Sequence, residues 1–181
     1  MVTILRELSY SHQWLYDGIS DMLSLSVGGR ERFRQIALQN LTISSNTRVL
    51  DLCCGCGQTT EFLVKSSNHV IVGLDASPLS LNRAKRNIPQ AIYVEAFDEN
   101  MLFENESFDL VHISASLHEI QPGKLQKQKS IREIYRVLRN GGILTLVDFQ
   151  QLVTPMFITI LWLFCWLFEM ETAWKFLQLD C

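Results

Sequence analysis

An excess of positive charge is missing from this sequence, and so is any signal-peptide pattern. Its 16 lysines and arginines are outnumbered by 19 acidic residues, which gives a formal net charge of −3. Proteins that hold nucleic acid present a strongly basic surface, so nucleic acid is not an expected partner. The N-terminal stretch MVTILRELSYSHQW has neither the apolar core nor the cleavage site of a signal peptide, which favours a cytoplasmic location.

Paired cysteines or histidines at metal-ligand spacing are missing as well. The five cysteines are odd in number, and three of them crowd together at Cys53, Cys54 and Cys56. No second Cys or His pair accompanies them, so we predict no metal site. Their crowding favours reduced thiols over a disulfide framework. We expect these small side chains to line a tight loop.

What the sequence does contain is an alternation of short apolar runs and helical segments. Its 181 residues are enough for one domain with a real core. The alternation predicts a parallel sheet of about five strands with helices on both faces. We expect strands at 48–52, 70–74, 91–96, 107–114 and 143–147, and helices at 30–41, 59–65, 79–87 and 124–139.

Two details of these helices are predicted from local signals. Ser77 and Pro78 are typical of a helix start. The last helix, 124–139, should be amphipathic and should end in a left-handed cap at 140–142. Its apolar side is predicted to contain Leu125, Ile131, Ile134, Tyr135 and Leu138.

The stretch 48–60, RVLDLCCGCGQTT, predicts a strand, a tight turn and a helix start. Gly55 and Gly57 permit a positive φ and allow a ligand to lie against the backbone. The helix start beyond them presents unpaired N–H groups to a polar or anionic group. The full dinucleotide fingerprint G-x-G-x-x-G is not met, because Thr60 stands where its third glycine would be.

The acid before this loop carries a resemblance to a known family. Asp51, Gly55 and Gly57 are similar to the h-h-D-x-x-x-G-x-G signature of class I methyltransferases that depend on S-adenosylmethionine (SAM). The resemblance implies that Asp51 lies near the methionine end of SAM, partly through water, and that the glycines pass its sugar and methionine portions. Asp75 closes the next apolar run, VIVGLD, eighteen positions after Gly57. An acid there can accept both ribose hydroxyls, as in dinucleotide-binding folds.

Further stretches strengthen the resemblance. SFDLV at 107–111 and RVLRNGGIL at 136–144 are similar to family motifs, and the acid of the first is expected to be structural. The lead-in from Tyr16 to Arg34 resembles the ubiquinone/menaquinone-biosynthesis type, in which this arm folds over the cofactor. The resemblance implies that Tyr16 lies beside the sulfonium, where cation–π attraction operates. For Tyr10 and Trp14, packing onto the domain remains an equal alternative.

The segment 97–103 departs from the family pattern. Phe97 occupies the place expected for the acid that grips the adenine, and Asp98 follows it. Either Asp98 takes over the adenine amino group, or that contact is lost and Phe97 merely packs. We favour Asp98.

The acceptor side is expected at the carboxyl edge of the sheet, where open α/β folds bind their ligands. His118 lies just beyond the fourth strand and could take a proton, although a capping role remains open. Asp148 ends the fifth strand on the same rim. The predicted catalytic residues are His118 and Asp148, and the predicted cofactor-binding residues are Tyr16, Asp51, Cys53, Gly55, Gly57, Asp75, Ala76, Asp98 and Ser114.

The segment 152–168, LVTPMFITILWLFCWLF, contains no charge. It falls short of the roughly 20 residues that a bilayer requires. We favour a helix that seals the active site over peripheral membrane contact or a span, and an apolar lid suits a lipophilic acceptor. The predicted parts are a helical arm at 1–43, a SAM-binding core at 44–149 and an apolar helical segment at 150–181.

The resemblance implies a sheet with the strand order 3-2-1-4-5. The family normally continues through two more strands, for which this sequence has no candidate. Their lack predicts an unpaired sheet edge that favours association. The predicted function is SAM-dependent methyl transfer to a small, lipophilic, quinone- or phenol-like acceptor. The alternative is an impaired SAM-binding or interaction protein, dimeric through that edge. A nicotinamide-dependent dehydrogenase is a third interpretation.

Overall fold

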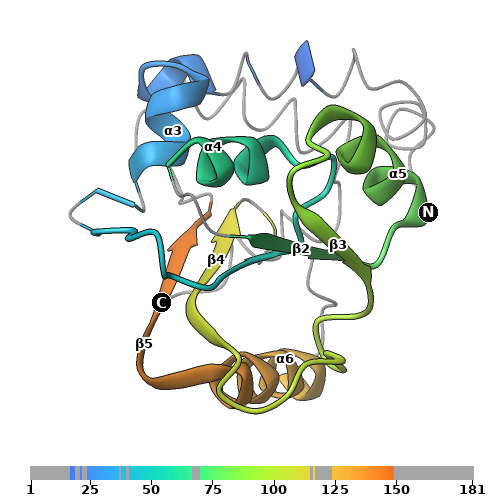
Figure 1. Cartoon of the computed structure of the whole chain (residues 1–181). Helices are drawn as coiled ribbons and strands as arrows, with labels where there is room; N and C mark the ends of the chain where they lie inside the picture. The colour runs from blue at the N-terminus through green and yellow to red at the C-terminus, as the bar shows by residue number, and fades with distance from the viewer. Residues whose placement is uncertain are drawn as a thin grey trace. The chain divides into compact units, whose positions relative to one another are not determined.

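A computed structural model describes residues 17–18, 21, 24–36, 38–39, 41–66, 70–114, 116 and 124–148. A five-stranded sheet in the order β3-β2-β1-β4-β5 forms its centre, and every neighbouring pair is parallel (Figure 1). Both the parallel sheet and the strand order are therefore confirmed. The strands are β1 (Val49–Leu52), β2 (Ile71–Asp75), β3 (Ile92–Glu95), β4 (Phe108–Ser114) and β5 (Leu138–Val147).

The chain divides into two compact units. One combines residues 1–33 with 148–181, and the other comprises residues 34–147. The described part of the first unit contains the 3-10 helix η1 (Leu25–Val27) and the start of α3 (Arg30–Ile36). There, Asp21 accepts hydrogen bonds from the guanidinium of Arg30. The predicted division at 43 and 149 stays a prediction.

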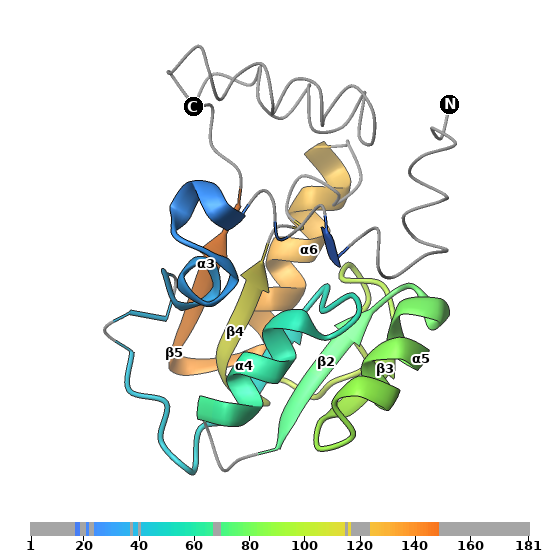
Figure 2. The same cartoon turned by 90° about the horizontal axis from the view of Figure 1, so that it is seen from above.

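The second unit has helices on both faces of the sheet. The helices α4 (Gln58–Ser66) and α5 (Pro78–Asn87) lie on one face and α6 (Lys124–Val137) on the other, as Figures 1 and 2 show. Successive side chains of a strand point to opposite faces, so each strand contributes to two cores. Between the sheet and α6 are packed Leu50, Leu52, Leu74, Val111, Ile113, Ile134 and Val137. The core on the opposite face contains Leu38, Val49, Leu63, Ile71 and Leu110.

Local signals at α5 work as predicted. The Ser77 hydroxyl accepts a hydrogen bond from the backbone N–H of Ser80 at 3.3 Å, and Pro78 opens the helix. The cap satisfies one of the backbone donors that a helix start leaves unpaired. The helix ends at Asn87, as expected.

The apolar side predicted for α6 is partly wrong. Ile131 and Tyr135 are 61% and 81% exposed, whereas Ser130, Ile134 and Val137 are buried. The buried set follows the helical spacing of four and three residues, and the exposed pair is displaced from it by one position. Periodicity therefore predicted the helix correctly but placed its buried face incorrectly.

Two predicted helix ends are also wrong. The α6 helix stops at Val137, and β5 begins directly at Leu138, so no cap separates them. Gly141 does adopt a positive φ of 76°, but it does so inside the β5 range, where pairing with β4 shifts register. At the other helix, α3 ends at Ile36 rather than at residue 41.

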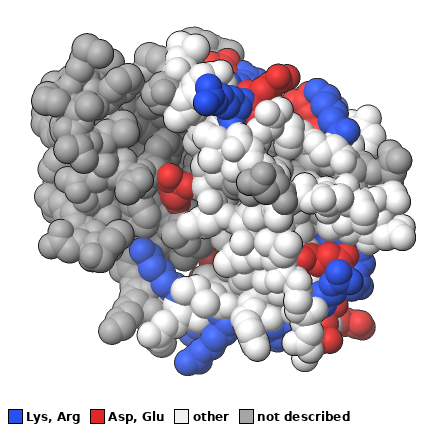
Figure 3. Space-filling view, turned by 90° about the vertical axis from the view of Figure 1, so that its left-hand side faces the viewer, with Lys and Arg blue, Asp and Glu red and all other residues white. Residues whose placement is uncertain are grey.

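The outer strand β5 presents apolar side chains to the surface. Ile143, Leu144 and Leu146 are between 44% and 49% exposed. Figure 3, which looks from the side where β5 lies in Figure 1, shows a broad area without charged residues. In the described part of the chain, no helix combines the length and apolarity that crossing a membrane requires. The segment 152–168 lies outside that part.

The two loop glycines are expected to differ in their tolerance of a side chain. At Gly57 (φ 84°), an added Cβ would lie 2.6 Å from Cδ1 of the buried Ile88 and 3.2 Å from Cβ of Ala84. At Gly55 (φ 53°), no atom of the described residues lies within 4 Å of an added Cβ. We expect Gly57→Ala to lower the free energy of unfolding by about 3 kcal/mol and Gly55→Ala by about 1 kcal/mol. Urea denaturation followed by circular dichroism measures both, and equal losses would contradict the packing explanation.

Candidate functional site

The glycine loop, residues 53–57, connects the end of β1 to the start of α4. It is tied to the neighbouring strand by a hydrogen bond from the Cys54 N–H to the carbonyl of Leu74 at 3.0 Å. Since β1 lies between β2 and β4, the loop sits where the strand order reverses. This is the switch point at which open α/β sheets bind ligands.

The loop uses a positive φ at three residues. Gly55 and Gly57 have φ values of 53° and 84°, and Cys53 has 58° although it is not a glycine. A Cβ added at Gly55 would meet no described residue, whereas one added at Gly57 would meet Ala84 of α5 and the adjoining Ile88. Only Gly55 therefore offers bare backbone to a ligand, because the missing side chain of Gly57 makes room for the protein's own packing.

Asp75, at the end of β2, joins the glycine loop to the start of α5. Its Oδ2 accepts from the Gly55 N–H and its Oδ1 from the Ser77 N–H, both at 2.8 Å. Burial raises the pKa of this carboxyl, and the backbone donors partly oppose the rise. Each carboxylate oxygen can accept a second hydrogen bond, so capacity for ribose hydroxyls remains. The next residue, Ala76, is exposed.

Asp51 is buried beneath the loop, with an exposed fraction of 1%. The Thr60 hydroxyl donates to its Oδ2 at 2.6 Å. Burial raises the pKa of Asp51 to about 7, although Thr60 and the charge of Arg34 oppose the rise. The threonine, which sequence reasoning noted only as a mismatch to the dinucleotide fingerprint, is therefore the partner of this acid. The predicted contact of Asp51 with the cofactor stays a prediction.

The connection from β3 to β4 carries Phe97 and Asp98. Phe97 is 63% exposed, so it is not packed into the core. The choice between an adenine contact by Asp98 and the loss of that contact stays a prediction. The Oδ2 atom of Asp98 is buried and has no hydrogen-bond partner among the described residues. A buried acceptor without a donor is rare in folded proteins and marks a place where a donor from a ligand would fit.

Ser114 and Ser116 link the end of β4 to the glycine loop. The Ser116 hydroxyl lies 2.9 Å from the carbonyl of Ser114 and 3.4 Å from that of Cys53. Sequence reasoning named Ser114 but missed Ser116. No local signal marks Ser116, because its second acceptor lies 63 residues away in the chain.

A buried histidine on β4 was also missed. His112 has an exposed fraction of 0%, and its register partners are Asp51 on β1 and Thr145 on β5. Its Nδ1 lies 2.8 Å from the Thr145 hydroxyl, whereas its buried Nε2 has no hydrogen-bond partner in the part of the chain that the structure describes. Burial lowers the pKa of His112 to about 4, so the ring is neutral at physiological pH.

Three predicted residues have no described position beside this loop. Tyr16 and His118 lie outside the described residues, and Asp148 belongs to the first unit. Their roles stay predictions.

Comparisons with known proteins give a consistent finding. Residues 49–142 match a family described as "Methyltransferase domain". The chain is 48% identical to an uncharacterized methyltransferase of Synechocystis over 180 residues, which cover 99% of this chain and 84% of that protein. It is 31% identical over 136 residues to the ubiquinone/menaquinone biosynthesis C-methyltransferase of Campylobacter jejuni, covering 70% of this chain and 56% of the relative.

A solved structure agrees with these relatives. The S-adenosylmethionine dependent methyltransferase from Mesorhizobium loti superimposes with a TM-score of 0.55 at 25% identity. The match covers 66% of this chain and 53% of that one. The chain thus spans about half the length of the Campylobacter jejuni and Mesorhizobium loti proteins.

His112 is expected to make stability depend on pH. Its folded pKa of about 4 lies below the ordinary 6.5, so between these values the unfolded chain binds a proton that the folded chain does not. The free energy of unfolding therefore falls as pH falls through this window, by about 2 kcal/mol between about pH 7.5 and about pH 5. The variant His112→Gln lacks this loss.

Urea denaturation of both proteins at the two pH values measures the difference. Asp51, whose raised pKa gives a slope of opposite sign, is present in both proteins and cancels in the comparison. A stability difference between the two proteins that does not change with pH would rule out the buried neutral imidazole.

Proposed function

The chain belongs to the class I SAM-dependent methyltransferases, and from this membership we propose that it transfers a methyl group to a small, lipophilic acceptor of the quinone or phenol type. The observation that carries the proposal for the site is the unpartnered, buried carboxylate oxygen of Asp98. The adenine amino group of SAM is a donor of the kind that this oxygen lacks. The name of the Campylobacter jejuni relative and the uncharged segment 152–168 support a lipophilic acceptor.

The described residues divide the binding of SAM among three neighbouring connections. In our proposal Asp75 accepts the ribose hydroxyls, Gly55 lets the cofactor approach the backbone, and Asp98 accepts from the adenine. Asp51, with 1% exposure, acts mainly by its hydrogen bond to Thr60, which fixes the first turn of α4 to the end of β1. We further assign to the rim of the cofactor site Tyr16, Cys53, Gly57, Ala76 and Ser114.

Methyl transfer from SAM requires little acid–base catalysis by the protein. When bound, SAM supplies a methyl group that a sulfonium has already activated for in-line displacement. The chain has to hold the acceptor in line and exclude water. We propose that His118 and Asp148 take up the proton that the acceptor releases. Peripheral membrane contact through 152–168 remains part of the proposal for a lipophilic acceptor.

A second candidate is a SAM-binding protein that dimerises and does not transfer methyl groups. The exposed apolar side chains of the outer strand β5 favour it, because an uncovered strand edge promotes association. Transfer of radiolabelled methyl groups to prenylated hydroquinones, measured together with the mass of the protein in solution, separates the two. A monomer with turnover supports the enzyme, and a dimer that binds SAM without turnover supports the second candidate.

Asp75→Asn is expected to weaken binding of the product S-adenosylhomocysteine (SAH) by about tenfold or more, because a charged acceptor is lost. Asp109→Asn is the matched control. Asp109 is buried and, like Asp75, accepts from a backbone N–H, that of Arg48, but at the opposite end of the strands. Its variant should bind SAH as the wild type does. Calorimetric titration measures all three, and a folded wild type without micromolar affinity for SAH would overturn the proposed function.

A further inference from the structure

The connection between β3 and β4, residues 96–107, requires an anchor if it is to hold Asp98 in place. Two of its apolar side chains, Phe97 and Leu102, are 63% and 74% exposed, so burial of these side chains does little to anchor it. Met101 is buried, and the ring of Phe103 packs edge-on against Phe108 at 4.9 Å. These two contacts hold side chains, and we expect polar groups to fix the backbone of the connection.

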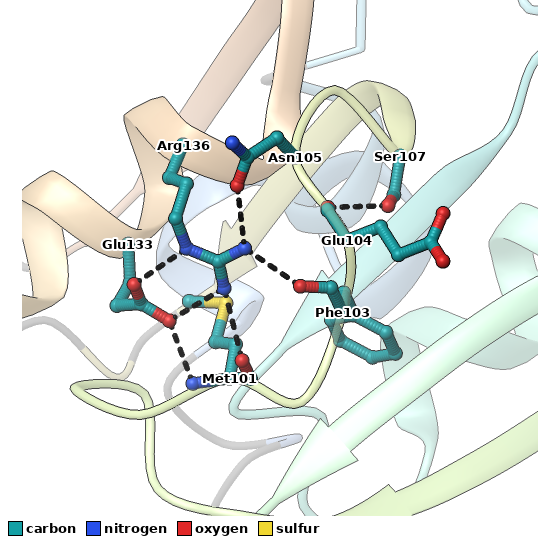
Figure 4. A network of polar contacts seen from close by, with 7 residues as sticks. All are labelled: Met101, Phe103, Glu104, Asn105, Ser107, Glu133 and Arg136. Atoms are coloured by element: carbon teal, nitrogen blue, oxygen red, sulfur yellow. Dashed lines mark hydrogen bonds and ion pairs between the residues drawn. The ribbon is translucent and has the colours of Figure 1, made fainter.

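The side chain of Arg136 on α6 supplies those groups (Figure 4). Its Nη2 donates to the carbonyl of Met101 at 2.9 Å, and its Nη1 donates to the carbonyl of Phe103 at 2.6 Å. Nη1 also lies 3.1 Å from Oδ1 of Asn105. One guanidinium thus spans five residues of the connection, which the point charge of a lysine could not do.

Glu133, one turn earlier on α6, orients this guanidinium. Its two carboxylate oxygens accept from Nε and Nη2 of Arg136 at 2.7 and 2.8 Å. Its Oε2 also accepts from the backbone N–H of Met101 at 2.8 Å. The pair therefore satisfies both the N–H and the carbonyl of Met101, as a neighbouring strand would. The pairing lowers the pKa of Glu133 and raises that of Arg136, so both stay charged.

A single turn connects the fixed backbone of Met101 to Asp98. The N–H of Asn100 donates to the carbonyl of Phe97 at 3.1 Å, which closes the turn containing Asp98 directly before Met101. We propose that Arg136, oriented by Glu133, is a positioning residue for adenine recognition, because it fixes the backbone that places the unpartnered carboxylate oxygen of Asp98. The inference rests on the proposed function, in which Asp98 accepts from the adenine amino group.

The test compares SAH with S-inosylhomocysteine, in which a carbonyl oxygen replaces the adenine amino group. We expect the wild type to prefer SAH by about tenfold or more, because the analogue removes the donor that Asp98 requires. Arg136→Ala should reduce this preference to about threefold or less, because Asp98 is no longer held. Calorimetric titration at a temperature where circular dichroism shows folded protein measures the ratio, and a general loss of stability does not change it.

Arg139→Ala is the matched control. Arg139 follows closely in the chain and pairs with Asp109, at 2.7 Å from its Oδ1, rather than with the connection. Its variant should lose a comparable ion pair and keep the wild-type preference. If Arg136→Ala does not fold, Arg136→Lys keeps the charge without the fork, and we expect it to reduce the preference in the same direction.

The outcomes separate the two proposals. A wild type that binds neither ligand overturns the proposed function and this inference with it. A wild type that binds both ligands equally leaves SAM binding intact but overturns the role of Asp98, and with it the inference. A wild type that prefers SAH, together with an Arg136 variant that prefers it equally, overturns the inference alone. The single variant Asp98→Ala and the double variant Asp98→Ala, Arg136→Ala should prefer SAH over S-inosylhomocysteine to the same extent. This result would support the positioning role of Arg136, because both residues then act on one contact.

Discussion

One carboxylate holds together two of the three connections that form the candidate site. Asp75 accepts from the N–H of Gly55 in the β1–α4 loop and from that of Ser77 at the start of α5. Both helix starts are thereby fixed relative to the carboxyl ends of β1 and β2. This arrangement leaves the charge of Asp75 partly buried. Burial raises the pKa of the carboxyl, and the two backbone donors oppose that rise only in part. A site held this way is preorganised before any ligand arrives.

The sheet beneath the site contains polar side chains where an apolar core would be more stable. Asp51, His112 and Thr145 are register partners on three adjacent strands and are all buried. Two hydrogen bonds offset part of their desolvation, from Thr60 to Asp51 and between His112 and Thr145. Burial moves the pKa of the acid up and that of the histidine down, so both groups move toward their neutral forms.

The two faces of the sheet contribute to the site in different ways. From one face, α4 provides Thr60 and α5 provides the helix start that Ser77 caps. From the other face, α6 holds the β3–β4 connection through Glu133 and Arg136. The ion pair is partly exposed, so its value lies in geometry more than in net stability. Three connections from different parts of the chain are thus brought to one edge of the sheet.

The sequence by itself determined the elements, because their signals are local. Apolar periodicity and the alternation of strands and helices were sufficient for the parallel sheet, and the family motifs implied its strand order. Ser77 and Gly55 marked turns whose chemistry lies within a few residues. Only the tertiary structure decided which side chains meet. Thr60 with Asp51, Arg136 with Met101 and Ser116 with Cys53 are pairs separated by 9, 35 and 63 residues. The exposed Ile131 and Tyr135 make the same point, since helical spacing defines a face and packing decides how that face is rotated.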